Sequence, residues 1–180
     1  NVDSSVVVKT KNFDLPVRTN KNGSFKIPSG TLVDTCFTSD FFVEDADAWR
    51  TEAWEMIRQR SDLHFLMITK RINRVMECLP ADWKDGYDNV TVCCTVENQL
   101  CADNRLPVYK AIPIKHKIII CEPLLEEISL DAYNIGEWVE QVVAGGESGY
   151  EARIRNFDWI MKLHDICVKN NVSFWFKQTG

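Results

Sequence analysis

Val90-Thr91-Val92-Cys93-Cys94-Thr95-Val96-Glu97-Asn98 is the stretch that decides the fold. Its first seven residues form an apolar, β-branched run, and an acid and an amide follow it at once. Because the apolar residues are continuous and do not alternate with polar ones, the run predicts a strand buried on both faces of a parallel sheet. The polar pair that ends it is then expected at the carboxyl edge of that sheet.

The same pattern occurs at five other places along the chain. It recurs about every thirty residues, which is the length of a strand, a crossover helix and the return to the next parallel strand. The other apolar runs are Leu32–Phe37, His64–Ile68, Lys117–Cys121, Val139–Ala144 and Val172–Phe176, and polar or glycine-rich clusters end them at 38–40, 69–71, 122–123, 145–148 and 177–178.

Helical periodicity occupies the intervals between these runs. Trp49, Ala53 and Ile57 form one apolar stripe within Asp45–Arg60, as expected for a helix that packs on a sheet. Three further helices are predicted: one over Ile72–Leu79 that Pro80 stops, one over Asn98–Ala111 that Pro107 kinks or ends early, and one that Asn156 caps and Asn170-Asn171 closes.

Alternating strands and helices predict an α/β protein with a parallel sheet. Two architectures satisfy this pattern, an open doubly wound sheet or a whole or partial (β/α) barrel. A barrel gathers the loops after all its strands at one mouth, whereas an open sheet does so only at its switch point. Because a polar cluster follows every strand, we favour a partial, TIM-barrel-like (β/α) sheet of about six strands with covering helices. Residues 1–30 are expected to be an extended or irregular lead-in, and residues 31–180 the barrel domain.

Composition limits the classes of function. The 180 residues, 45% of them hydrophobic, suffice for one domain with a core. A net charge of −5 argues against a broad basic surface for nucleic acid. It does not exclude a local basic groove. The seven cysteines lack zinc-type spacing and are expected to be buried, reduced thiols. No signal peptide or membrane-length apolar segment is present, so we predict a cytoplasmic protein without a membrane partner.

Charged and polar residues gather at the predicted mouth. Like charges crowded in a partly dry cleft raise one another's pKa, so the carboxylates suit a divalent metal, a substrate ammonium or general acid–base work. The basic residues suit a carboxylate or a phosphate. The alternative is that these groups pair with one another or stay solvated. The candidate pocket residues are Asp40, Lys70, Arg71, Glu97, Asn98, Glu122, Glu147, Ser148, Lys177 and Gln178.

Gly145-Gly146-Glu147-Ser148-Gly149 is the most suggestive single motif. Its glycines let the backbone approach a ligand closely and expose amides that bind anions, so Gly145, Gly146 and Glu147 are predicted to bind a cofactor. The spacing is not that of a Walker loop or a dinucleotide fingerprint, and a flexible strand-to-helix turn is the alternative. No histidine is placed as a catalytic base, since His64 and His116 open strands at the opposite end and His164 lies within a helix.

Five stretches carry a family resemblance across nearly the whole chain: Phe65–Arg71, Cys94–Gln99, Cys121–Leu125, Gly145–Gly149 and Phe174–Gly180. In this order they resemble an uncharacterised, phage-associated bacterial protein family. Its members typically carry an upstream three-cysteine motif and resemble radical S-adenosylmethionine enzymes. The resemblance implies a partial (β/α) barrel, a [4Fe–4S] cluster held by three cysteines, and S-adenosylmethionine on the unique iron. In such enzymes a stretch similar to Gly145-Gly146-Glu147 binds the methionyl amine, although there it follows an early strand.

The chain departs from that pattern because the three-cysteine motif does not occur after Asn1. We therefore expect a fragment that lacks one barrel strand, carries no cofactor of its own and is catalytically inactive. Three interpretations of the parent protein stay open. It is a radical iron–sulfur enzyme acting on an unknown small molecule or nucleic acid, a divalent-metal-dependent barrel hydrolase, or a non-catalytic, phage-related binding module.

Overall fold

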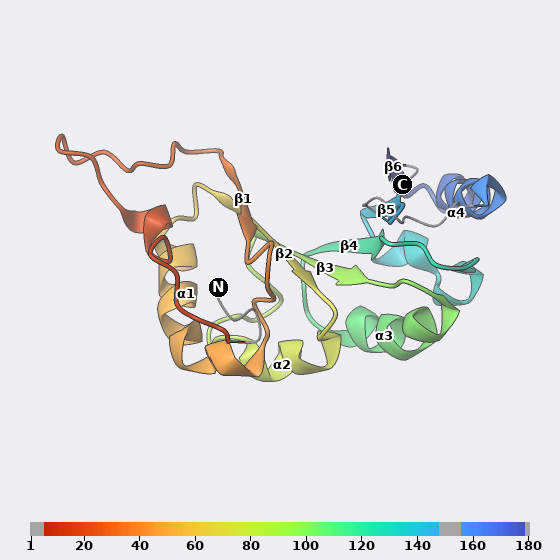
Figure 1. The fold of residues 1–180 in the computed structure, drawn as a ribbon, viewed down its shortest axis with the longest axis horizontal. Helices are drawn as coiled ribbons and strands as arrows, with labels where there is room; N and C mark the ends of the chain where they lie inside the picture. The colour runs from red at the N-terminus through yellow and green to blue at the C-terminus, as the bar shows by residue number, and fades with distance from the viewer. Residues whose placement is uncertain (1–5, 148–155, 179–180) are drawn as a thin grey trace.

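The sheet is a curled half-barrel of parallel strands (Figure 1). The computed structural model describes residues 6–147 and 156–178. Within them the strands pair in sequence order, β1-β2-β3-β4-β5-β6, so the order never reverses and the sheet has no switch point. The α/β partial barrel predicted from the sequence is thus confirmed. The strands are β1 Leu32–Thr35, β2 His64–Thr69, β3 Val90–Thr95, β4 His116–Cys121, β5 Gln141–Gly145 and β6 Ser173–Gln178.

Helices follow the strands and lie along the outer side of the curl (Figure 1). In the described ranges, no helix combines the length and the apolar character needed to cross a bilayer. The α-helices are α1 Asp47–Gln59, α2 Val75–Cys78, α3 Gln99–Ala111 and α4 Phe157–Lys169, and the short 3-10 helices are η1 Leu15–Val17, η2 Glu44–Ala46, η3 Ile72–Arg74, η4 Asp131–Tyr133 and η5 Ile135–Glu137.

Two helix predictions need correction. The continuous helix expected over Ile72–Leu79 is wrong, because η3 forms its first turn and only four α-helical residues follow in α2. Its buried residues, Ile72, Val75 and Cys78, recur every third position, the period of a 3-10 helix. An early end at Pro107 is also wrong, since α3 continues to Ala111. Pro107 is on the exposed side of α3, where water can satisfy the carbonyl that loses its partner.

The two faces of the sheet are packed differently, because successive residues of a strand point to opposite sides. Met67, Val92 and Ile119 belong to the main core between the sheet and the helices. A second, smaller apolar group lies on the opposite, concave side. We call it the concave-face cluster; it consists of Leu66, Ile68, Cys93, Ile118, Ile120 and Val143.

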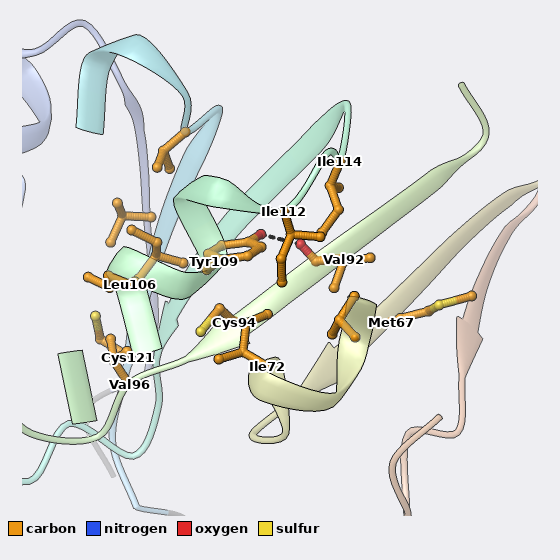
Figure 2. Packing of buried hydrophobic residues seen from close by; sticks show 14 of the residues in the cluster. Met67, Ile72, Val92, Cys94, Val96, Leu106, Tyr109, Ile112, Ile114 and Cys121 are labelled. Carbon is orange, nitrogen blue, oxygen red and sulfur yellow. Dashed lines mark hydrogen bonds between the residues drawn. The ribbon is translucent and has the colours of Figure 1, made fainter. Parts of the chain in front are cut away.

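Tyr109 ties α3 to two neighbouring strands within the main core (Figure 2). Its ring is fully buried, and its hydroxyl donates to the carbonyl of Val92 on β3. The same hydroxyl oxygen accepts the amide of Ile118 on β4 at 3.0 Å. One side chain therefore satisfies a buried acceptor on β3 and a buried donor on β4.

The lead-in before β1 is held against the end of α1 by Arg60, which is fully buried. The Arg60 guanidinium donates to the carbonyl of Pro16 and, at 2.8 Å, to that of Ile27. It also pairs with Asp62 and lies 4.1 Å from the ring centre of Phe25. An otherwise irregular segment is thereby fixed to the domain by one cation.

We predict that Tyr109→Phe lowers the free energy of unfolding by about 1–3 kcal/mol, because it leaves a buried amide and a buried carbonyl without their shared partner. Urea denaturation measures the loss. Tyr133→Phe is the matched control, since its hydroxyl bonds to exposed Asp103 and its removal should cost well under half as much. Equal losses in the two variants contradict the role assigned to Tyr109.

Candidate functional site

Four charged side chains line the concave side of the sheet at the carboxyl ends of its strands. We call them the rim: Lys70, Glu97, Glu122 and Lys177. Lys70 and Glu122 come directly after β2 and β4, Glu97 comes two residues after β3, and Lys177 is in β6. Lys70, Glu97 and Glu122 are each an even number of residues from a concave-facing position of their own strand, which places them on the concave side. The pairing of β5 with β6 is irregular at Ala144 and Gly145, and the ion pair with Glu122 places Lys177 on the same side.

Glu97 is the most buried member of the rim, with 6% of its surface exposed. It forms ion pairs with Lys70 and, at 2.8 Å, with Arg105 from α3. The hydroxyl of Thr95 donates to the same carboxylate at 3.1 Å. Burial raises the pKa of Glu97, but the hydrogen bond from Lys70 and the charge of Arg105 outweigh it and hold this pKa at about 2. Glu97 is therefore a carboxylate at neutral pH.

Glu122 reaches across a whole strand to Lys177. Both its carboxylate oxygens lie 3.1 Å from the Lys177 ammonium, although β5 separates β4 from β6. The crossing point is Gly145, where an added Cβ would come within 3.0 Å of the Glu122 carboxyl carbon. Gln178 also approaches this carboxylate, at 3.4 Å. The absence of a side chain at Gly145 is what lets the Glu122–Lys177 pair form.

Charges along the rim run base, acid, acid, base in strand order. The two acids stand at the ends of neighbouring strands β3 and β4, and each has its own lysine on the side away from the other. This arrangement offers a zwitterion an acidic centre for its cation and a base on either flank for its anion. Among the described residues no three His, Cys, Asp or Glu side chains come together in a way that could hold a metal ion.

Asp40 and Arg71 are brought together, but in a loop anchor apart from the rim. The Asp40 carboxylate accepts from the Thr69 hydroxyl, from the amide of Phe42 at 2.9 Å and from Arg71 at 3.1 Å. It is 7% exposed. These bonds fix the segment after β1 to the end of β2, so Asp40 has a structural role.

The remaining residues of the predicted pocket and cofactor site are not members of the rim. Asn98 caps α3, since its side chain accepts the amide of Cys101 at 2.8 Å. The Gly146 amide donates to the carbonyl of Gln178 at 3.0 Å, which continues the pairing of β5 and β6. Glu147 is half-buried, and Ser148 lies outside the described residues. The structure thus joins Lys70 with Glu97, and Glu122 with Lys177 and Gln178.

The cysteines are free, and five of the seven are buried: Cys78, Cys93, Cys94, Cys121 and Cys167. Burial raises the pKa of the Cys93 and Cys94 thiols to about 12, so both are protonated at neutral pH. Cys36 is exposed, at the end of β1, contrary to the expectation of buried thiols. An iron–sulfur cluster requires grouped thiolates, which these cysteines do not supply within the described residues.

Two residues, one on α3 and one on the concave side of the sheet, were missed from the sequence. Arg105 lies on the apolar stripe of α3 with Ala102, Leu106 and Tyr109, and a lone cation on such a stripe was the available signal for a buried partner. Trp175 is in β6 and is exposed. Its exposure could not be predicted, because it lies within a continuous apolar run and such a run does not show which residues face outward.

The fold and the rim define an α/β half-barrel protein with a charged edge on its open side. A family model described as "Protein of unknown function (DUF5131)" matches residues 2–180, and the chain belongs to that family. The comparison with curated proteins found no match, and neither did the comparison with solved structures.

We predict that Glu97→Gln destabilises the protein by about 1–3 kcal/mol at pH 7, because Lys70 and Arg105 lose their shared counter-charge. The folded pKa of about 2 lies below the ordinary 4.5, so this stabilisation is complete above pH 4.5 and is lost as the pH falls toward 2. Urea titrations across this range should show the difference between wild type and variant shrinking. Glu127→Gln, which breaks an exposed pair with Lys162, is the control and should change stability by less than about 1 kcal/mol. If the difference in unfolding free energy between wild type and Glu97→Gln does not change with pH, the role assigned to the Glu97 ion pairs is contradicted.

We predict that Gly145→Ala separates Glu122 from Lys177, because the new methyl group occupies the path of the Glu122 side chain. The pair is partly exposed, so the loss of stability should be about 1 kcal/mol. The same substitution in a Glu122→Ala background should cost markedly less. A double-mutant cycle by thermal denaturation measures this coupling, and additive effects contradict it.

Proposed function

We propose that this chain is the partial barrel of a phage-associated, S-adenosylmethionine-dependent iron–sulfur enzyme, with its reaction face at the rim. The observation that carries the proposal is the order of charges on the open side of the sheet, with Glu97 and Glu122 between Lys70 and Lys177. S-adenosylmethionine carries an ammonium and a sulfonium as well as a carboxylate. Its cations suit the two central acids and its carboxylate suits a flanking lysine.

The proposal agrees with the position of the rim. In barrel enzymes the residues that bind and react come from the carboxyl ends of the strands and the loops that follow them. Because the strands pair in sequence order, the ends of β2, β3, β4 and β6 all contribute to one edge. The concave-face cluster lies below this edge and offers an apolar floor, which excludes water from a bound ligand.

The described residues do not fit the iron–sulfur cluster itself. Cys93, Cys94 and Cys121 are buried in two different apolar clusters, and burial keeps their thiols protonated. We therefore assign no step of the chemistry to them. The cluster ligands in this proposal are the three cysteines of the upstream motif that the family resemblance implies, and the chain's own part is to bind and orient S-adenosylmethionine. When bound, the cluster would supply the electron for the reductive cleavage of S-adenosylmethionine.

A divalent-metal hydrolase has less support from the same residues. Each acid of the rim already pairs with a basic side chain, and Asp40 is bound within its loop anchor. Two-metal hydrolysis needs carboxylates that converge on the ion. Here each acid is already held by its own counter-charge, and within the described residues no third ligand joins them.

Equilibrium dialysis with labelled S-adenosylmethionine tests the proposal. We predict saturable binding that Glu97→Gln and Glu122→Gln each weaken by about 10- to 100-fold, because each loses a charge-assisted contact. Glu127→Gln, on the far side of the sheet, should bind as wild type. Binding that none of these variants changes contradicts the placement at the rim, and binding of Mn²⁺ that both rim variants abolish would favour the hydrolase.

Iron and sulfide analysis of the whole protein, expressed with any sequence that precedes Asn1, tests the cluster separately. About four irons per chain and an absorbance band near 400 nm are the expected result for a cysteine-ligated four-iron cluster. A colourless, iron-free protein after anaerobic reconstitution contradicts the iron–sulfur part of the proposal.

A further inference from the structure

Trp175 stands on the concave face of β6, and 56% of its surface is exposed. Its register partner on β5 is Val143, a member of the concave-face cluster. The chain neighbours of Trp175, Phe174 and Phe176, instead pack against the main core on the other side of the sheet. The indole therefore lies at the open side, next to an apolar floor.

Three other tryptophans of the chain are used differently. The indole N–H groups of Trp54, Trp83 and Trp138 each donate to a backbone carbonyl. Within the described part of the chain, Trp175 makes no such bond and no ring contact. A large flat ring, exposed on a sheet and free of partners there, is the usual form of a stacking platform for a planar ligand.

Lys177 adds a cation on the same face, two residues further along β6. The distance between such positions is about 7 Å along a strand, which is comparable to the separation of the base and the phosphate in a nucleotide. The Lys177 ammonium pairs with Glu122, yet its side chain is 43% exposed. An ammonium has three N–H donors, so it can bind a phosphate oxygen while it keeps its carboxylate partner.

The charges around this position favour a single nucleotide over a nucleic acid polymer. Binding of a polymer requires a series of phosphate contacts from a basic surface. Here the rim has equal numbers of acids and bases, and the whole chain has a net charge of −5. On β6, one aromatic platform and one exposed ammonium match one base and one phosphate.

We propose that Trp175 and Lys177 form a mononucleotide subsite, in which the base stacks on the indole beside Val143 and Ile120 and the phosphate binds Lys177. The subsite requires no iron–sulfur cluster, and it shares Glu122 and Lys177 with the rim. Glu122 holds the Lys177 ammonium in an ion pair, and Gly145 permits that pair to form.

Titration with AMP tests the subsite in the absence of iron and of S-adenosylmethionine. In ¹⁵N-labelled protein we expect AMP to shift one indole signal saturably, and Trp175→Phe identifies that signal. By equilibrium dialysis, Trp175→Ala should weaken AMP binding by about 5- to 150-fold, the effect of losing one stacked base. Lys177→Ala should weaken the binding of AMP but not that of adenosine.

Two control variants match these substitutions on the other side of the sheet. Phe157→Ala removes an aromatic ring of equal exposure from α4, and Lys162→Ala removes a lysine from an exposed ion pair. Both should bind AMP as wild type. The proposal is overturned if the Trp175 signal does not move at millimolar AMP, or if Trp175→Ala binds AMP as well as wild type. It is also overturned if a single-stranded oligonucleotide binds at Trp175 and AMP does not displace it.

Discussion

Parallel pairing in strict sequence order is the constraint on which the rest of this molecule depends. A parallel strand can follow its neighbour only through a crossover, so every connection leaves the sheet at the same edge. Right-handed crossovers then place the helices on one side. The consequence is a sheet with two unequal faces, one packed into the main core and one with only the small concave-face cluster. The rim lies where the open face meets the edge at which all six strands end.

The electrostatics of the rim follow from this geometry. Glu97 and Glu122 come from adjacent strands and are like charges that repel each other. Lys70 and Arg105 neutralise the first, and Lys177 neutralises the second from two strands away. A single glycine on the intervening strand makes the second pair possible. The rim thus places two acids at the ends of adjacent strands, each with its own base, which is an arrangement that a cationic or zwitterionic ligand can use.

Most of the fold follows from local sequence patterns, and the contacts of the site do not. The six apolar runs predict the strands closely, because short runs rich in β-branched and aromatic residues favour strands. The helix starts expected at Asn98 and Asn156 are confirmed, and in the structure both side chains cap their helices. By contrast, the pairing of Glu97 with Arg105 and the reach of Glu122 over Gly145 depend on how distant segments meet. The direction of Trp175 depends on strand register, which a uniformly apolar run does not reveal.

The central claim is that the concave face is open to a ligand. Comparing the solvent accessibility of Ile118 and Ile119 tests this claim directly, since the two residues are neighbours on β4 and face opposite sides of the sheet. Methyl groups of the two residues can be labelled and their relaxation measured with a soluble paramagnetic agent. We predict strong relaxation of the Ile118 methyl and little change at Ile119, which is fully buried. Equal protection of the two methyl groups would contradict an accessible concave face and, with it, the placement of the site.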